Sequence, residues 1–294
     1  MPDKRLDDNG LEITLLNLKD IFILLTNNAG AHNSIYRGKF LGTSVTAAQW
    51  QAIRDGTFTD MYIGDYWMIG GQDWVICDFD YYIRCGSEDI TDHHLILMPR
   101  TGMTIPSGTA LYGTSETLSF LAGESSTAFE WNSSNSTSGG YKFSRIRKTI
   151  MKAANTIVIN AFGTNHVKAI TELYPNPSND TASGIASSWA WFDGSQTEDN
   201  AKSICDLCNE TMVYGQQVWG LGSVYTNVGF EVGIDKHQLS IFALDRSFVN
   251  TRAGWWLRSV SSAPDAACVG DAGYAGHTGA SAARAVRPRF LLVG

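Results

Sequence analysis

Short apolar runs that alternate with glycine-rich and polar connections form the main pattern of the chain. Three of them, MYIGDYWMI (residues 61–69), QDWVICDFDYYIR (72–84) and HHLILMPR (93–100), are rich in aromatic and β-branched residues, which are typical of strands. Gly70 and Gly71 separate the first two runs and predict a tight hairpin turn. The pattern therefore predicts three β-strands in this region.

Helical spacing is clear in only two segments. Residues 43–56 (TSVTAAQWQAIRDG) begin with Ser/Thr cap candidates and end at a glycine, which predicts a short helix. Residues 141–163 (YKFSRIRKTIMKAANTIVINAFG) keep apolar residues three or four positions apart until Gly163. The second segment is the strongest helix prediction in the chain.

The remaining segments are polar or irregular. Residues 124–140 are rich in Ser, Asn and Gly and predict a surface loop, and residues 175–200 form another turn-rich stretch. Residues 211–220 (TMVYGQQVWG) predict a strand or a turn in the core, and residues 242–294 are expected to add two or three closing strands. Together these patterns predict an α+β fold with short antiparallel sheets, two or so helices and long loops.

The length and apolar content, 294 residues and 44% hydrophobic, are sufficient for a substantial core. Residues 1–42 mix charges with an apolar stretch at 13–25 and end in polar residues. We interpret them as an N-terminal attachment or assembly element. Residues 43–294 are expected to form one domain.

The charge of the chain disfavours nucleic acid as a partner. The net charge is −7, whereas neutralising a phosphate backbone requires clustered Lys and Arg. The first residues lack an apolar core of signal-peptide length, and the apolar run at 20–30 is too short to span a bilayer. We therefore expect synthesis in the bacterial cytoplasm and no membrane insertion.

The cysteines and histidines do not predict a metal site. Five cysteines are an odd number in a long chain, so we expect them to be reduced. Cys205 and Cys208 have the spacing of a zinc-binding pair, but no second pair at matching spacing completes four ligands. His93 and His94 open a predicted strand, where neighbouring side chains point to opposite faces. We predict no metal and no cofactor, and packing of the two thiols as small apolar groups.

No catalytic motif stands out either. The chain lacks a nucleophile elbow, a phosphate loop, a zinc-protease helix and a Ser/Lys pair. Asp78, Asp80 and Glu130 are expected to have ordinary surface roles. We expect Arg258 and Arg287 to form structural ion pairs, because a buried guanidinium needs partners. The sequence thus gives no positive reason to predict an enzyme.

The C-terminal region contains the most unusual tract. CVGDAGYAGHTGASAARA (268–285) is small, polar and without hydrophobic rhythm, yet it lies between the strand-like segments GWWLRSV (254–260) and VRPRFLLVG (286–294). Trp255 and Trp256 in the first segment are expected to pack structurally.

This layout resembles the C-terminal variable region of proteins diversified by diversity-generating retroelements, which display it on a C-type lectin fold. The segments GDYWMI, HHLILMPR, VYG and RAGWWLRS are similar to landmarks of phage-encoded members, so the resemblance spans residues 45–294. It implies a C-type lectin-like domain with a variable region at about 259–286. Calcium-dependent sugar binding is not implied, because the triplets Glu-Pro-Asn, Gln-Pro-Asp and Trp-Asn-Asp are absent.

In that family, template adenines are copied with errors, so an AAC codon can become any NNC codon, and none of these encodes Lys, Glu, Gln, Met or Trp. Residues 259–286 contain none of these five types. The five make up about a seventh of the chain, so about four would be expected there by chance. The composition of the tract agrees with the resemblance.

A tract that accepts many side chains needs a backbone held by its flanks and side chains that face solvent, where substitutions usually change stability by within about 0.5 kcal/mol. Thirteen positions are predicted to be diversified and ligand-facing: Asp265, Ala267, Cys268, Gly270, Asp271, Ala272, Tyr274, Gly276, His277, Thr278, Gly279, Ala282 and Arg284. Gly273, Ala275, Ala280 and Ser281 are expected to be fixed spacers. Asp271, Tyr274, His277 and Arg284 have the chemistry for the strongest contacts.

The resemblance implies a non-enzymatic ligand-binding or receptor-binding protein, namely a phage tail adhesin for a bacterial surface target. Its expected location is the virion tail. Its expected partners are a bacterial surface protein or glycan, other virion tail proteins and further copies of itself in a homo-oligomer. One alternative is a bacterial surface-displayed variable protein. Another is an enzyme related to formylglycine-generating enzymes, which would need Cys205 and Cys208 as a reactive pair.

Overall fold

A computed structural model of the chain describes residues 27–84, 90–170, 204–216 and 237–294, the single positions 18 and 21, and the backbone of strands at 172–177 and 186–192. Helices and mainly antiparallel sheets occupy separate segments of the chain, so the predicted α+β class is confirmed. The finer C-type lectin-like arrangement stays a prediction.

The largest sheet has six strands in the order β1-β2-β3-β4-β13-β6. Their bounds are Phe40–Gly42 (β1), Tyr66–Ile69 (β2), Gln72–Phe79 (β3), His94–Pro99 (β4), Val167–Lys168 (β6) and Phe290–Val293 (β13). Strands β1 and β2 are parallel, and the other pairs are antiparallel. The three predicted strands are confirmed as β2, β3 and β4.

The turn between β2 and β3 has the predicted chemistry. Gly70 and Gly71 have φ of +63° and +77°, and Ile69 pairs with Gln72 across the turn. Two successive residues at positive φ form the turn type that matches the twist of a hairpin, and glycine adopts this conformation at little steric cost.

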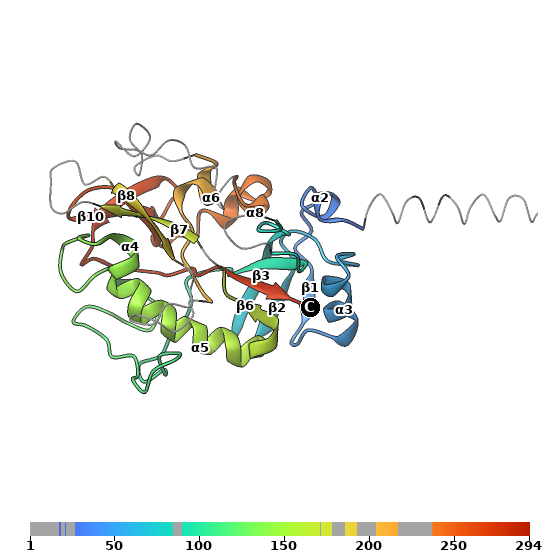
Figure 1. Cartoon of the computed structure of the whole chain (residues 1–294), viewed down its shortest axis with the longest axis horizontal. Coiled ribbons are helices and arrows are strands. Elements are labelled where there is room, and N and C mark those ends of the chain that lie inside the picture. The colour runs from blue at the N-terminus through green and yellow to red at the C-terminus, as the bar shows by residue number, and fades with distance from the viewer. Residues whose placement is uncertain are drawn as a thin grey trace, which may run out of the picture.

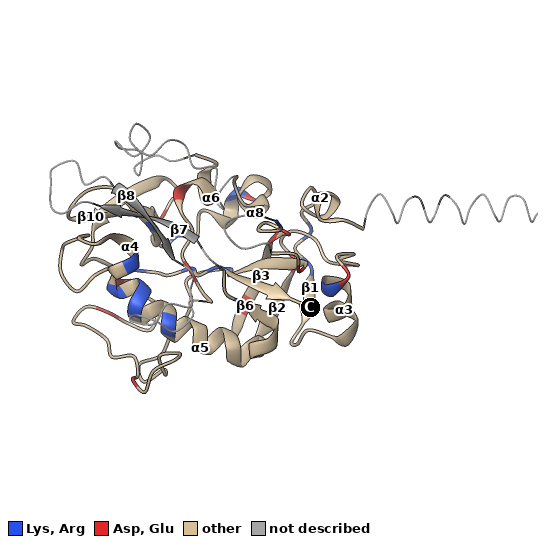
Figure 2. Ribbon diagram, in the orientation of Figure 1, with Lys and Arg blue, Asp and Glu red and all other residues tan. Residues whose placement is uncertain are grey.

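The helices are short, and the two longest lie in the two predicted segments. Their bounds, with 3-10 and π turns written η, are Ala29–His32 (α2), Ala47–Arg54 (α3), Gly140–Phe143 (α4), Ile146–Ile150 (η1), Met151–Phe162 (α5), Thr164–His166 (η2), Glu210–Tyr214 (α6), Ser240–Leu244 (α8) and Arg246–Phe248 (η3). Helix α3 starts at a capping box formed by Thr46 and Gln49. Lys and Arg gather along α4 and the start of α5 (Figure 2).

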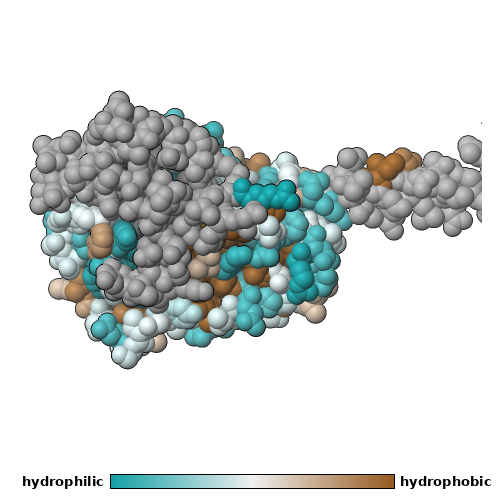
Figure 3. Space-filling view, viewed as in Figure 1, coloured by the Kyte–Doolittle hydropathy of each residue, from teal (hydrophilic) through white to brown (hydrophobic). Residues whose placement is uncertain are grey.

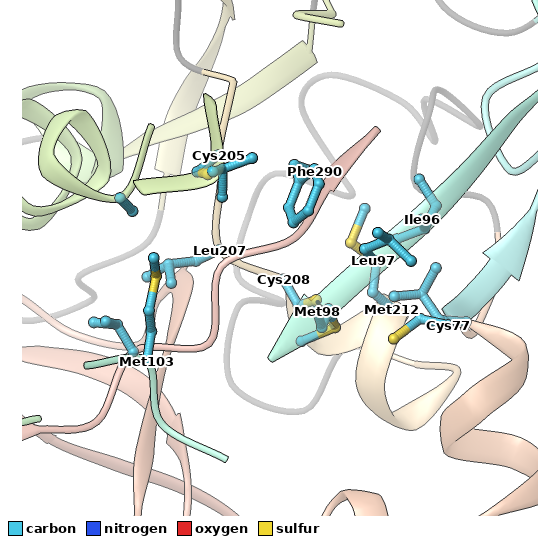
Figure 4. Packing of buried hydrophobic residues seen from close by; sticks show 14 of the residues in the cluster. Cys77, Ile96, Leu97, Met98, Met103, Cys205, Leu207, Cys208, Met212 and Phe290 are labelled. Carbon is cyan, nitrogen blue, oxygen red and sulfur yellow. Dashed lines mark hydrogen bonds between the residues drawn. The ribbon is translucent and has the colours of Figure 1, made fainter. Parts of the chain in front are cut away.

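Helix α5 packs through Phe162 on the large sheet. The ring of Trp74 on β3 lies edge-on to Phe162 and to Phe290, with centroid separations of 5.8 and 5.4 Å. Such aromatic pairs stabilise a core beyond the area they bury. One continuous cluster of buried residues extends from Ala52 to Leu292, so the described segments share a core. Figure 4 shows part of it, where Phe290 and several sulfur-containing side chains lie close together.

Residues 211–220 were predicted to be a strand or core turn, and that prediction is wrong for the described part. Helix α6 begins after Asn209, whose side chain accepts a hydrogen bond from the Met212 amide, and ends at Gly215 in the left-handed conformation. The segment is too short for helical periodicity to be visible. Residues 217–220 lie outside the described residues.

Residues 124–140 were predicted to be a surface loop, which is also partly wrong. Strand β5 (Phe129–Glu130) pairs with strand β12 (Ala283–Arg284), and the side chains of Phe129 and Trp131 are fully buried. The Trp131 indole donates to the Leu257 carbonyl at 3.2 Å. The numerous polar neighbours in the sequence conceal this buried anchor.

A second sheet has three strands in the order β11-β10-β9. Their bounds are Trp255–Val260 (β9), Asp265–Val269 (β10) and Ala275–Gly279 (β11). The tract without hydrophobic rhythm is therefore largely a regular hairpin, because backbone pairing with the buried β9 supplies the order that its small side chains do not reveal. Strands β7 (Glu172–Pro177) and β8 (Ala186–Phe192) form a separate pair, and the rest of the predicted 175–200 stretch lies outside the described residues.

The described part of the predicted N-terminal element packs on the large sheet. His32 is buried against the rings of Phe58, Tyr62 and Phe79, and the Asn33 side chain exchanges two hydrogen bonds with the backbone of Phe79. The attachment role of residues 1–42 stays a prediction, and most of residues 1–26 lie outside the described part.

The hairpin strand β10 lies at the end of the molecule opposite to α2, β1 and α3 (Figure 1). On the face in Figure 3, the end that carries α3 is mostly hydrophilic. Every helix in the described segments is too short or too polar to cross a membrane.

Candidate binding surface

Strand β9 forms the floor under the predicted variable tract, and all six of its residues are buried. Trp255 and Trp256 point to opposite faces of the sheet, as strand geometry requires. The Trp255 indole donates to the Val249 carbonyl at 3.3 Å, and the Trp256 indole donates to the Phe129 carbonyl at 2.7 Å. The predicted structural packing of both tryptophans is confirmed.

Arg287 supports this floor from the side of Trp255. Its guanidinium donates to the Phe248 carbonyl at 2.6 Å and to the Pro99 carbonyl at 3.2 Å, and it stacks on the rings of Phe248 and Trp255 at 4.1 and 4.8 Å. Burial lowers the pKa of Arg287 to about 10, so the group remains a cation at neutral pH. Within the described segments no carboxylate pairs with it, so the predicted ion pair is wrong here: carbonyl oxygens and aromatic faces take that role.

Arg258 has the predicted ion pair. Its Nη1 lies 3.9 Å from Oδ2 of Asp206, and both side chains are nearly fully buried. The backbone of Asp206 exchanges two hydrogen bonds with Arg289, at 3.0 and 2.7 Å. The strand that follows the tract is therefore tied to the same part of the core as β9.

The base of the hairpin is held by residues outside the tract. The Thr137 hydroxyl donates toward the carbonyls of Ser262 and Ala263 at 2.6 and 2.7 Å. The backbone N–H of Asn132 donates to the Ala280 carbonyl at 2.8 Å. These contacts involve only the backbone of the tract. They therefore fix its position without restricting which side chains it carries.

The tip of the hairpin is held by hydrogen bonds within its own backbone and by one residue from outside the tract. The Gly270 amide donates to the Tyr274 carbonyl at 2.8 Å, and the Gly273 amide donates to the Gly270 carbonyl at 2.9 Å. Gly273 has φ of +84°, a conformation that favours glycine, which supports the prediction that this position is a fixed spacer. From outside the tract, the Tyr214 hydroxyl donates to the Gly273 carbonyl at 3.3 Å.

Strand alternation divides the predicted site between two faces of the hairpin. Cys268 is paired with Gly276 on β11 and with Trp256 on β9, so these three share one face. Asp265 and His277 share the opposite face. We call the first the Tyr274 face, because the Tyr274 ring covers it, and the second the His277 face.

The Tyr274 ring lies against two glycines. A methyl group at Gly276 would be 3.2 Å from the ring and 3.4 Å from Sγ of Cys268, and one at Gly270 would collide with the ring. Tyr274 itself is 59% exposed, so it presents its outer side to solvent. Burial raises the pKa of the Cys268 thiol, while the nearby Arg284 guanidinium opposes that rise. This thiol is therefore protonated at neutral pH.

On the His277 face, Nδ1 of His277 lies 3.0 Å from Oδ2 of Asp265. The His277 side chain is 41% exposed and that of Asp265 is 25% exposed. Surface pairs of this kind contribute little to stability, because water competes for both partners.

The thirteen predicted positions divide into three groups. The exposed ones are Asp271, Ala272, Tyr274 and His277, as predicted. The half-buried ones are Asp265, Thr278, Gly279, Ala282 and Arg284. The predicted exposure is wrong for Ala267, Cys268, Gly270 and Gly276.

The four corrections have one cause. Ala267, Cys268 and Gly270 lie on or next to the central strand, and Gly276 lies under Tyr274, so neighbouring strands and the tyrosine ring exclude water from them. The binding role of all thirteen positions stays a prediction. Among the predicted spacers, Ala280 is buried, Gly273 and Ala275 are half-buried and Ser281 is exposed.

Arg284 lies beside the Tyr274 face, with its guanidinium carbon 6.0 Å from the Trp256 ring centre. It faces an open cleft of about 600 Å³ whose walls include Thr101, Thr127 and Gly254. A second cleft of about 530 Å³ lies at the hairpin tip and includes Tyr214 and Ala272. Both volumes lie within the range of small-ligand sites.

Three residues that shape this surface were not predicted from the sequence, namely Asn132, Asn135 and Thr137. They belong to the segment predicted to be a surface loop, yet they contact the tract; a side chain at Gly279 would collide with Asn135. The buried Trp131 beside them was the available signal, because a tryptophan in a polar run often anchors the run to the core.

The two cysteines of the predicted pair lie in the core. Cys205 and Cys208 are fully buried, and Sγ of Cys208 lies 3.7 Å from Sδ of Met98 (Figure 4). Burial raises the pKa of Cys205 well above its ordinary value, which disfavours the nucleophilic thiolate. The predicted packing as apolar thiols is confirmed, and Cys85 lies outside the described residues.

The histidine pair is engaged within the fold. Nδ1 of His93 lies 2.7 Å from the Asp80 carboxylate, and the same carboxylate accepts a hydrogen bond from the His94 amide. Nε2 of His94 accepts a hydrogen bond from the Tyr82 amide, and burial lowers the pKa of His94. Among the described residues no group of three or more His, Cys, Asp or Glu is arranged to hold a metal ion.

The acidic candidates are not an acid/base pair at the surface. Asp78 is fully buried and accepts hydrogen bonds from the amide and hydroxyl of Ser240, both at 2.9 Å. Asp80 is also largely buried, so the predicted surface role is wrong for both. Their desolvated carboxylates connect β3 to α8 and to the start of β4. Glu130 is half-buried, and desolvation raises its pKa.

Comparison of the chain with protein-family models, with curated proteins and with solved structures gives no match.

Proposed function

We propose that the chain is a non-enzymatic binding protein with a C-type lectin-like fold, which displays a replaceable surface generated by a diversity-generating retroelement. In this proposal the hairpin β10–β11 and strand β12 meet the ligand. The ligand is a protein or glycan on a bacterial surface, and the chain acts as a phage tail adhesin in a homo-oligomer, next to other tail proteins. No nucleic acid, membrane insertion, metal or cofactor is needed for this role.

One observation carries the proposal. The tract places Asp271, Ala272, Tyr274 and His277 in solvent, while residues outside the tract hold its backbone at the base and at the tip. Side chains of this kind can change without disturbing the core. The absence of Lys, Glu, Gln, Met and Trp from residues 259–286 agrees with diversification at adenines.

The arrangement of the molecule is also suited to display. The first described helix, α2, and the hairpin strand β10 lie at opposite ends (Figure 1). An attachment element at the N-terminus would therefore direct the hairpin away from the particle. A cell-surface protein anchored at its N-terminus would have the same geometry, so that alternative keeps the same binding surface.

The enzymatic alternative has less support. Formylglycine-type chemistry needs a reactive thiol near a substrate groove, whereas Cys205 and Cys208 are fully buried. Replacing both with alanine and assaying a cysteine-containing peptide separates the two functions. Turnover by the wild type that the variant lacks would favour the enzyme.

The direct test of the proposal is the DNA downstream of the gene. We expect a near-copy of the 3′ end that differs mainly at adenines, beside a reverse-transcriptase gene. Sibling copies should then differ at Asp271, Ala272, Tyr274, His277 and Arg284 while Trp255 and Arg287 remain fixed. Substitutions spread through residues 45–200 would contradict the proposal.

A further inference from the structure

Two glycines keep the cleft beside β12 open. A methyl group at Gly102 would lie 2.7 Å from Cβ of Ala285, and one at Gly254 would collide with Nη1 of Arg284. The remaining walls come largely from alanines and from Thr101 and Thr127. The two glycines therefore give the cleft its space and allow the Arg284 guanidinium to lie directly against the backbone of residue 254.

Arg284 has no carboxylate partner among the described residues. By contrast, Arg37 lies 2.6 Å from the Asp65 carboxylate, and Arg145 lies 2.5 Å from that of Glu124. Nε of Arg284 is shielded from water and has no hydrogen-bond partner in the described part of the chain. A ligand in the cleft cannot reach the shielded Nε, so the two Nη groups of the guanidinium are the donors left for an anionic ligand.

Among the described residues, the groups nearest to the cleft do not neutralise the positive charge of Arg284. Glu130 lies on the neighbouring strand, opposite Ala283, but its pKa responds to burial, Glu124 and Arg145. Trp256 lies beneath the guanidinium and offers only its ring. The group is thus positioned as a free cation at the side of a concave site.

The cleft walls also restrict the kind of ligand. Residues Thr101 and Thr127 are exposed and offer hydroxyl groups, and the glycines offer accessible backbone. No large apolar or aromatic side chain lines the cleft among the described residues. Such walls are suited to a ring that carries hydroxyl groups, whereas an apolar peptide side chain would find no matching surface.

We propose that the Arg284 cleft binds the carboxylate-bearing ring of an acidic sugar, with the Arg284 guanidinium holding the carboxylate through two parallel hydrogen bonds. This inference rests on the proposed function, since it names the ligand class of the same surface. It assigns the charge recognition to Arg284 and the ring to the threonine and glycine walls. Sibling copies with another residue at position 284 would lose this preference.

The test uses the full chain and four small probes, sodium glucuronate, glucose, inorganic phosphate and the peptide Gly-Glu-Gly, titrated in NMR experiments. We expect glucuronate to bind at least about tenfold more tightly than glucose, because a charge-assisted pair is typically worth that factor or more. Arg284→Gln should remove this preference. The matched control Arg54→Gln changes an exposed arginine on α3, at the far end of the molecule, and should leave binding unchanged.

A second variant separates position from charge. Gly254→Ala keeps every charge but displaces the Arg284 guanidinium from the backbone of residue 254. We expect glucuronate affinity to fall by about tenfold, as in Arg284→Gln. Unchanged affinity in a folded Gly254→Ala variant would overturn the proposed geometry.

Several outcomes overturn the inference. Equal binding of glucuronate and glucose would show that the charge has no role. Tighter binding of phosphate or of the peptide Gly-Glu-Gly than of glucuronate would show that the ligand is a phosphate or an acidic peptide and not an acidic sugar. A bacterial-cell binding assay keeps this failure distinct from failure of the proposed function. If the wild type binds cells and neither added glucuronate nor Arg284→Gln reduces that binding, only the proposed cleft ligand is wrong. If sibling genes all carry the same tract sequence, the proposed display function is wrong.

Discussion

Arg284 and Arg287 lie three residues apart and have opposite surroundings. Arg287 is fully buried, donates to two carbonyls and stacks on two aromatic rings. Arg284 lies at an open cleft without a carboxylate partner among the described residues. The chain therefore changes from a structural frame to a replaceable surface within one short segment. The term frame refers below to β9 with Arg287 and the core around them. The term display surface refers to Arg284 and to the side chains on the Tyr274 and His277 faces that reach solvent.

The difference lies in what each region does with its backbone and side chains. In the frame, side chains such as Trp256 and Arg287 make specific contacts that hold the fold together. On the display surface, the backbone is bound at the base and at the tip, and the exposed side chains add little. Stability and recognition can then change independently.

The largest expected effect comes from replacing Arg287 with alanine, and the same change at Arg284 is its comparison. Arg287→Ala removes a large buried side chain and leaves two carbonyl oxygens without donors, so we expect a loss of about 3–5 kcal/mol in the free energy of unfolding. Arg284→Ala should change it by within about 0.5 kcal/mol. Urea unfolding of both variants measures this, and equal losses would erase the distinction between the regions.

A pH series sharpens the contrast, because the frame contains a buried acid. Burial raises the pKa of Asp78 to about 6, above the ordinary value that the unfolded chain retains. The folded protein therefore holds this proton more tightly, and the resulting stabilisation is present below about pH 4 and is lost as the pH rises through about 6.

Asp78→Asn removes this titration and keeps an acceptor oxygen for Ser240. We expect the variant to gain about 1–3 kcal/mol relative to the wild type between pH 4 and pH 7. Unfolding free energies at several pH values measure the difference, and taking the difference cancels the opposite effect of His94, whose pKa is lowered by burial. A difference that stays constant with pH would contradict this account.

The Tyr274 face should show energetic coupling between the exposed Tyr274 and the buried Gly270 beneath its ring. A methyl group at Gly270 collides with the Tyr274 ring, so Gly270→Ala should displace the ring in the wild type and be tolerated better with Tyr274→Ala. We expect a coupling energy of about 1 kcal/mol in the double-mutant cycle. Additive effects would mean that the ring does not depend on the glycine.

The smallest effect is expected on the His277 face. Asp265→Asn removes the charge partner of His277 at a partly exposed site, so the free energy of unfolding should change by less than about 0.5 kcal/mol. Asp206→Asn, beside the buried Arg258, is the matched change in the frame and should cost several times more. Thermal unfolding of both variants measures the ratio, and similar costs would contradict the comparison.

Strong local patterns predicted much of the fold. The aromatic runs predicted β2, β3 and β4, and cap residues and apolar spacing predicted α3 and α5. Helix α6 was missed because five residues are too few to reveal a period. The hairpin was missed because Ala and Gly carry no apolar alternation, so its order comes from pairing with β9.

Only part of the candidate site was predictable from the sequence. Composition located the tract, but the faces of its side chains depend on strand register, which the sequence did not reveal. This explains why Cys268 and Gly276 were expected in solvent. Asn135 was missed because its contact with Gly279 joins segments far apart in the chain.

The display surface should accept replacement of its side chains while the frame keeps the fold. The most direct measurement is the urea unfolding of a variant that carries five changes together: Asp271→Asn, Ala272→Ser, Tyr274→Ser, His277→Asn and Arg284→Ser. We predict one cooperative transition and a free energy of unfolding within about 1 kcal/mol of the wild type. A loss as large as that of Arg287→Ala, about 3 kcal/mol or more, would contradict the claim.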